Sequence, residues 1–163
     1  MLVNAAVNGN SVTKTGGCGG CADAGAVSKQ TLGSSGYVEY TASETGTLRA
    51  MGLGESPTDP GSMLFSIRLY GSTAEVREGG VYKSETPFAT GDVLRISVTS
   101  GAVTYSRNGR VFFTSSGAGA PLFVDVTLYD LNATITNVTI GAASAAPARA
   151  AASLAPRSRA GFR

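Results

Sequence analysis

Two cysteines separated by two glycines come nearest to a chemical motif in this sequence. Cys18 and Cys21 have the C-x-x-C spacing of thiols that bind zinc, exchange disulfides or close a short disulfide loop. A complete structural zinc site needs four ligands, and the chain has 2 Cys and 0 His. A thioredoxin-type redox site needs a strand–helix–strand context, which the neighbouring residues do not predict. A local disulfide and a pair of free loop thiols both remain open, and no metal centre is predicted.

Two short motifs of serine enzymes that act on penicillin also occur, but their positions are incompatible with that chemistry. Residues 11–14 match S-x-x-K and residues 14–16 match K-T-G, so the two motifs overlap on one strand-like segment and cannot face each other across a cleft. Glycoside hydrolysis needs two carboxyl groups on opposite sides of one cleft, whereas Glu39, Asp92 and Asp125 fall on different elements. Histidine, the commonest general base, is absent. We therefore predict no catalytic residue, no cofactor and no enzyme activity.

Two Asn-x-Thr sequons lie close together near residue 135. Asn132 and Asn137 are candidate N-glycosylation sites for a chain that passes through a eukaryotic secretory pathway. The alternation of residues 133–140 places Asn137 on the same face as Ile135, which predicts a buried position and argues against modification. Chance matches in a threonine-rich strand are the preferred interpretation.

The elements that must position any site are predicted to be short strands. Residues 63–70 place Phe65, Ile67 and Leu69 on one face and polar residues on the other. The pair Asn108-Gly109 between two apolar segments predicts a two-residue hairpin, because both central residues of a type I′ turn need positive φ. The predicted strands cover residues 37–42, 47–53, 63–70, 73–78, 92–99, 102–107, 110–114, 122–129 and 133–140.

Strands at this spacing, without a helical periodicity, predict an all-β antiparallel sandwich of two sheets. Alternation also predicts which side chains lie between the sheets, and the residues one position along should be more exposed. The predicted core positions are Phe65, Ile67, Leu69, Leu94, Ile96, Val98, Val124, Val126 and Leu128.

The charge of the chain is unevenly distributed. Residues 1–141 carry 9 basic and 11 acidic side chains, whereas residues 142–163 carry four Arg and no acid. The mildly acidic body argues against nucleic-acid binding, which needs clustered Lys and Arg. The longest apolar runs are far shorter than the roughly 20 residues of a membrane-spanning helix. Residues 142–163 contain ten Ala and two Pro, a composition that predicts an irregular tail or linker.

One stretch of the body resembles a known family. The pattern formed by Gly91-Asp92, Gly101, Val103, Tyr105 and Asn108-Gly109 is similar to a module of large bacterial surface and secreted proteins, and SPRY domains carry a related hairpin. The resemblance covers roughly residues 2–140. It implies a concanavalin-A-like or SPRY-like jelly roll that acts as a non-catalytic binding or structural module. A tryptophan common in that family is replaced here by Gly-Gly-Cys-Ala.

We therefore predict a jelly-roll domain over residues 1–141 and an Ala/Pro/Arg-rich tail over 142–163. The first functional hypothesis is recognition of carbohydrate or extracellular matrix, outside the cell or at its surface. The alternative is a SPRY-like protein-interaction subunit that docks through its loops and tail in an intracellular or organellar assembly, because no signal peptide is visible. Alternation places Arg68, Tyr70, Arg95 and Tyr129 on the outside of one sheet, so they are the candidate ligand-binding residues. The candidate partner-binding tail residues are Arg149, Leu154, Arg157, Arg159, Phe162 and Arg163.

Overall fold

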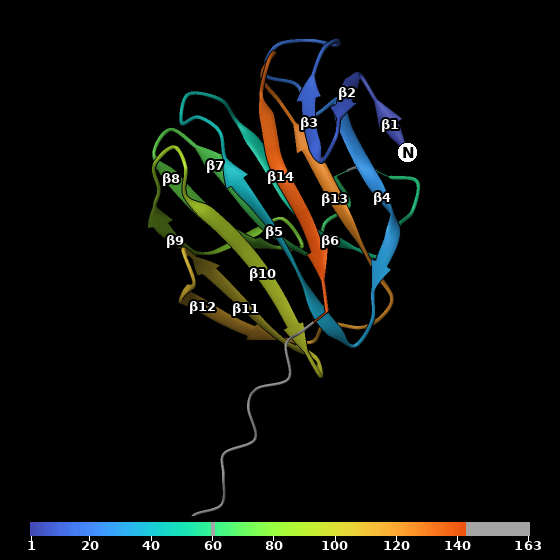
Figure 1. Ribbon diagram of the computed structural model, residues 1–163, viewed down its shortest axis with the longest axis vertical. Coiled ribbons are helices and arrows are strands. Elements are labelled where there is room, and N and C mark those ends of the chain that lie inside the picture. Colours follow the sequence, from blue (N-terminus) through green and yellow to red (C-terminus); the bar gives the residue numbers. More distant parts are fainter. Residues whose placement is uncertain (60, 143–163) are drawn as a thin grey trace, which may run out of the picture.

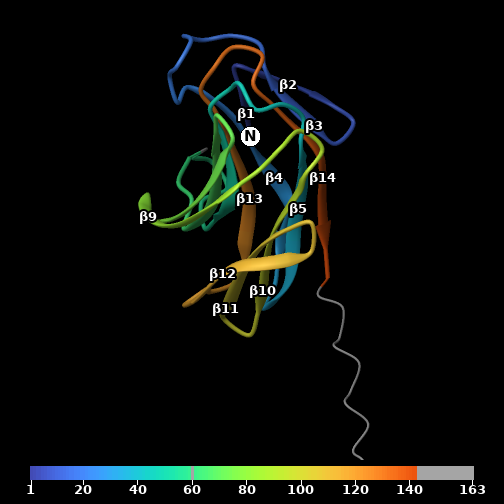
Figure 2. The ribbon, with the colours of Figure 1, turned by 90° about the vertical axis from the view of Figure 1, so that its left-hand side faces the viewer.

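The structure is a computed structural model that describes residues 1–59 and 61–142. These residues form two antiparallel sheets of seven strands each, packed face to face as a jelly-roll sandwich (Figure 1). Figure 2 shows the two layers from a second direction, with β9 and β14 on opposite sides. The predicted fold class is confirmed. The described part of the chain contains no helix with the length and apolarity needed to cross a membrane.

The two sheets are called sheet I and sheet II. Sheet I runs β1 (Leu2–Val3), β4 (Ala24–Leu32), β13 (Leu122–Leu128), β6 (Arg49–Gly54), β7 (Phe65–Tyr70), β8 (Thr73–Glu78) and β9 (Val81–Pro87). Sheet II runs β12 (Arg110–Ser116), β11 (Ala102–Arg107), β10 (Val93–Thr99), β5 (Ser35–Ala42), β14 (Thr134–Gly141), β3 (Ser11–Lys14) and β2 (Ala5–Asn8).

The apolar core lies between these sheets. Burial of one large aliphatic side chain contributes about 1.5–3 kcal/mol, so the facing alternate positions of β7, β10 and β13 hold the layers together. All nine predicted core residues are buried: Phe65, Ile67, Leu69, Leu94, Ile96, Val98, Val124, Val126 and Leu128.

The predicted hairpin joins β11 to β12. Asn108 and Gly109 occupy the turn with φ of 51° and 79°, the positive values that a type I′ turn requires. The Asn108 side chain also fastens the turn to β10, because its Oδ1 accepts a hydrogen bond of 2.8 Å from the Val93 N–H.

The prediction that residues next to the core positions are more exposed is wrong at the centre of sheet I. Ser66, Asp125 and Thr127 point away from the core, yet all three are buried. The loop between β6 and β7 lies over Asp125 and Thr127, since the Gly61 N–H donates to the Asp125 carboxylate and Gly61 lies close to Thr127. Ser66 donates to the carbonyl oxygen of Arg77 on the neighbouring strand β8. The central strands of sheet I are therefore buried on both faces.

The prediction that Asn137 is buried is also wrong. A β-bulge interrupts the pairing of β14 with β5 between Thr136 and Thr139, and Asn137 adopts a φ of 54° there. The extra residue breaks the period of two, so the Asn137 side chain turns outward and is exposed. Five strands also lie outside the predicted segments: β1, β2, β3, β4 and the exposed edge strand β9.

A fully buried lysine organises one end of the sandwich. The Lys14 ammonium donates hydrogen bonds to the carbonyl oxygens of Cys18 (2.7 Å), Cys21 (2.9 Å) and Tyr129 (2.8 Å). It also forms an ion pair of 2.5 Å with Asp23. The hydrogen bond from Lys14 is the main cause that holds the pKa of the Asp23 carboxyl below its ordinary value. Lys14 therefore joins the β3–β4 loop to the end of β13.

We expect Lys14→Met to lower the free energy of unfolding by about 2–4 kcal/mol, because three carbonyl oxygens and a carboxylate lose their cationic donor. Urea denaturation monitored by circular dichroism measures the change. The matched control is Lys29→Met at an exposed position, which should change the unfolding free energy little. Equal unfolding midpoints for the two variants would contradict the assigned role of Lys14.

Candidate binding pocket on the outer face of sheet I

Strand register creates a depression in the middle of the outer face of sheet I. Small residues occupy its centre, because Gly52 of β6 pairs with Ser66 of β7 and Ala50 pairs with Arg68. A Cβ atom added to Gly52 would collide with the carbonyl oxygen of Phe65 and with Ser66. The larger side chains flank this centre, Asp125 and Thr127 on β13 and Glu75 and Arg77 on β8.

A pocket of about 170 Å³ lies in this depression. Its size suits one small group, since pockets for drug-sized ligands measure roughly 300–1,000 Å³. Its wall combines two guanidinium groups, two hydroxyl groups, a phenol and a thioether, and no carboxylate lines it among the described residues. The lining residues are Ala50, Gly61, Met63, Ser66, Arg68, Arg77, Gly80, Thr127 and Tyr129.

The β6–β7 loop forms one wall of the pocket and is anchored through Gly61. The Gly61 N–H donates a hydrogen bond of 2.8 Å to Oδ2 of Asp125. Gly61 has a φ of +100°, and a Cβ atom at this position would lie 3.2 Å from Oγ1 of Thr127. Glycine therefore satisfies both the backbone conformation and the close approach of the loop to the sheet.

Asp125 is buried beneath this loop, and its other oxygen, Oδ1, has no hydrogen-bond partner among the described residues. Burial raises the pKa of Asp125 to about 6, the Gly61 hydrogen bond lowers it, and the charge of Asp59 raises it further. The Asp125 side chain therefore holds the loop but does not itself line the pocket.

The two guanidinium groups of the pocket are linked by Glu75. The Arg77 Nε donates a hydrogen bond of 2.9 Å to Oε2 of Glu75. The Arg68 Nε lies 3.4 Å from the same oxygen but makes no hydrogen bond there, and it is buried without a partner among the described residues. Oγ1 of Thr127 is likewise buried without one. The pocket thus contains polar atoms whose hydrogen-bonding capacity is unused.

The structure brings together only two of the four ligand-binding candidates. Arg68 and Tyr129 line the pocket, whereas Tyr70 is exposed at the end of β7 and is not a lining residue. Arg95 lies on sheet II, where it pairs with Glu39 at 2.6 Å and stacks on Tyr37 at 4.0 Å. Alternation tells which residues point outward but not which sheet carries them, so the common face expected for these residues does not form.

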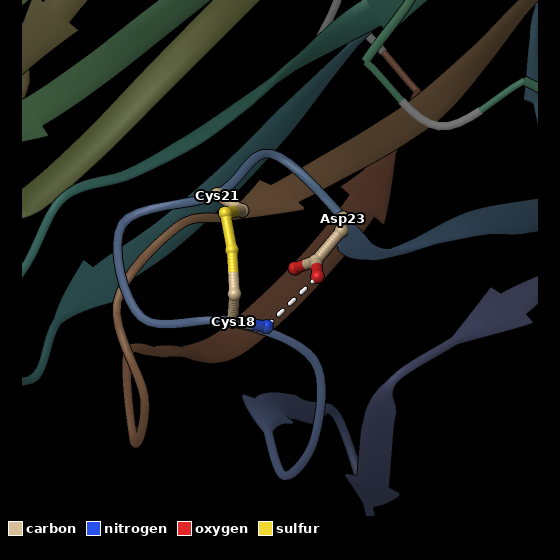
Figure 3. Close-up of side chains that lie close together, drawn as sticks. All are labelled: Cys18, Cys21 and Asp23. Carbon is tan, nitrogen blue, oxygen red and sulfur yellow. Dashed lines mark hydrogen bonds between the residues drawn. A yellow bond between two sulfur atoms is a disulfide. The ribbon is translucent and has the colours of Figure 1, made fainter.

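Cys18 and Cys21 form a disulfide, and Figure 3 shows Asp23 beside it. Oδ2 of Asp23 accepts a hydrogen bond of 2.9 Å from the Cys18 N–H. The sulfur atoms are bonded to each other, so in this state they offer no thiolate ligands. The sequon residues Asn132 and Asn137 are both exposed. The tail candidates Arg149, Leu154, Arg157, Arg159, Phe162 and Arg163 lie outside the described residues.

Sequence reasoning missed the contributions of Ser66, Arg77 and Thr127 to the pocket. Asp125 and Thr127 carried a signal, because they interrupt the apolar run of residues 122–128 with two polar side chains. Ser66 and Arg77 carried none that distinguishes them from solvated strand residues. Only the strand pairing places them opposite each other.

Comparisons with known proteins identify the fold. No family model matches the chain, and no curated protein matches it. A human SPRY domain superposes with a TM-score of 0.66 at 15% identity, covering 90% of this chain and 99% of that one. The SPRY domain of human HERC1 gives 0.54 at 14% identity, covering 89% and 94%. The alginate lyase AlgAT5 of polysaccharide lyase family 7 gives 0.50 at 12% identity, covering 80% and 67%.

These likenesses show a concanavalin-A-like, SPRY-like fold. At identities of 12–15% they show the fold alone. The same architecture is found in a lyase and in SPRY domains, so the fold does not decide between catalysis and binding.

We expect Asp125→Asn to remove a pH dependence of stability. The pKa of Asp125 is about 6 in the folded state against 3.8 for an unperturbed carboxyl, so the folded state binds the proton more tightly. The free energy of unfolding should therefore fall by roughly 2 kcal/mol between pH 4.5 and pH 7 on account of this group.

Urea denaturation at both pH values measures that decrease in the wild type and in the variant. The lowered pKa values of Asp23 and Asp92 affect stability below their ordinary value of 3.8, outside this window. An equal pH dependence in both proteins would contradict the raised pKa of Asp125.

Proposed function

We propose that the chain is a non-catalytic carbohydrate-binding module whose pocket on sheet I holds one sugar ring. The observation that carries the proposal is the composition of the pocket wall, where hydroxyl, guanidinium and phenol groups surround a floor of small residues. A sugar presents hydroxyl groups that both donate and accept hydrogen bonds. Oγ1 of Thr127 has no hydrogen-bond partner among the described residues, and Oγ of Ser66, which donates to the Arg77 carbonyl oxygen, can still accept. The ring of Tyr129 adds an amphipathic wall.

The absence of catalytic activity is part of the proposal. General acid–base catalysis needs a titratable group within hydrogen-bonding reach of the substrate. The described lining residues include no carboxylate or thiol, their one phenol is that of Tyr129, and the Asp125 carboxylate accepts the Gly61 hydrogen bond without lining the pocket. The pocket therefore supplies groups that bind and orient a ligand more readily than groups that transfer protons.

A protein-interaction module is the alternative function. The SPRY-like fold supports it, and so do exposed apolar side chains on the edge strands, Val81 and Tyr82 on β9 and Val111 on β12. β9 and β12 border the same edge of the sandwich. A protein partner would cover this edge, whereas a sugar would occupy the pocket.

We propose an extracellular or cell-surface location, as in the large surface proteins that the sequence resembles. The Cys18–Cys21 disulfide supports it, because such bonds persist in oxidising compartments. An intracellular or organellar assembly remains the alternative location. Mass spectrometry of the native protein with and without alkylation distinguishes the oxidised pair from free thiols.

Glycan-array screening followed by calorimetry tests the proposed function. Ala50→Leu fills the floor of the pocket, so we expect it to lower the affinity more than tenfold. Thr127→Val removes one hydroxyl group, so we expect it to lower the affinity about threefold to tenfold. Arg110→Gln on the opposite sheet is the control and should bind as the wild type does. Binding that survives Ala50→Leu in a folded protein would place the site elsewhere.

A further inference from the structure

We infer that the sugar bound in this pocket carries a carboxylate, so that the ligand class is a uronic acid or another acidic saccharide. This inference rests on the proposed function and names the chemical class of its ligand. It follows from the balance of charge around the pocket and from the donors that the fold leaves without partners.

The charge balance of the pocket is positive. The side chains of Arg68 and Arg77 both line it, and the one carboxylate paired with them, Glu75, is shared between the two guanidinium groups. One negative charge offsets only one of the two positive charges. The Asp125 carboxylate accepts the Gly61 hydrogen bond and is not among the residues that line the pocket.

The donors of the pocket also remain incompletely used. The Nε of Arg68 is buried and makes no hydrogen bond to the described residues. Burial of a charged donor without a hydrogen bond costs free energy, and a ligand that accepts this hydrogen bond would remove the cost. Guanidinium groups bind carboxylates through paired hydrogen bonds, which suits a planar anionic ligand better than a neutral hydroxymethyl group.

Other arginines of the body provide the contrast. Arg95 donates two hydrogen bonds to Glu39 and lies over the ring of Tyr37, and Arg107 lies near Asp92 and donates to the carbonyl oxygen of Pro87. Arg95 and Arg107 each have a carboxylate of their own, whereas Arg68 and Arg77 share Glu75, and Arg77 also donates to the carbonyl oxygen of Gly80. An acidic ligand is therefore expected at this pocket, where two guanidinium groups share one carboxylate.

A sugar acid fits the site better than an acidic peptide. The pocket takes one small group, and Ser66 and Thr127 place hydroxyl groups beside the two arginines. A hexuronic acid presents ring hydroxyls and a carboxylate within one ring, so both kinds of lining group find a partner. An ionised peptide carboxylate only accepts hydrogen bonds, so it offers no donor to the lone pairs of the Thr127 hydroxyl, whereas a sugar hydroxyl does.

The test compares matched saccharides on the full chain by calorimetry. The probes are an oligouronate, the same oligosaccharide with its carboxylates reduced to alcohols, and an acidic peptide of equal charge. We expect the oligouronate to bind at least tenfold more tightly than its reduced form, with an affinity that falls as salt increases. Arg77→Gln should abolish most of this preference, and Arg77→Lys should restore part of it.

The outcomes separate the inference from the proposed function. Equal binding of the acidic and reduced oligosaccharides overturns the inference and leaves carbohydrate binding in place. Binding of neither saccharide overturns both, as does binding of the acidic peptide alone. Because Arg77 is partly exposed on β8, its variants should fold, and thermal unfolding curves check this. An unchanged preference in folded Arg77→Gln also overturns the inference.

Discussion

The hydrogen bond from the Gly61 N–H to Asp125 anchors the β6–β7 loop over the outer face of sheet I, and the shape of that face depends on it. The loop covers the centre of the sheet and buries polar residues of β13 that would otherwise face water. It also forms one wall of the pocket. The arrangement also costs stability, because the Asp125 carboxylate is buried with one oxygen that accepts no hydrogen bond from the described residues. The fold tolerates this cost at the position where the candidate site is built.

The sequence predicts the layers of this protein better than it predicts the site. Alternation in β7, β10 and β13 places the core residues correctly, because burial between two sheets enforces a period of two. The same period fails at Asn137, where a bulge adds one residue, and at Asp125, where a loop covers the second face. Arg68 and Arg95 both point outward, but only strand pairing shows that they belong to different sheets.

The two functional hypotheses use different parts of the same architecture. A jelly roll has broad sheet faces and two open edges, and its ligands are determined by the side chains that each chain places there. Here the face of sheet I carries a polar depression with an excess of guanidinium groups, and the edge formed by β9 and β12 carries exposed apolar residues. The two regions adjoin, because Arg77 of the pocket pairs with Tyr82 of the edge strand, so the two proposed ligands would approach neighbouring surfaces of one domain.

The buried ammonium of Lys14 has a consequence for how the β3–β4 loop responds to its surroundings. Three carbonyl oxygens and one carboxylate surround it, the same kind of ligand set that binds calcium in many extracellular loops. The cation at the centre of this loop is covalently part of the chain. Dilution or a chelator removes the ion from a calcium-binding loop. The β3–β4 loop has no such ion to lose, so its conformation does not depend on the supply of divalent metal.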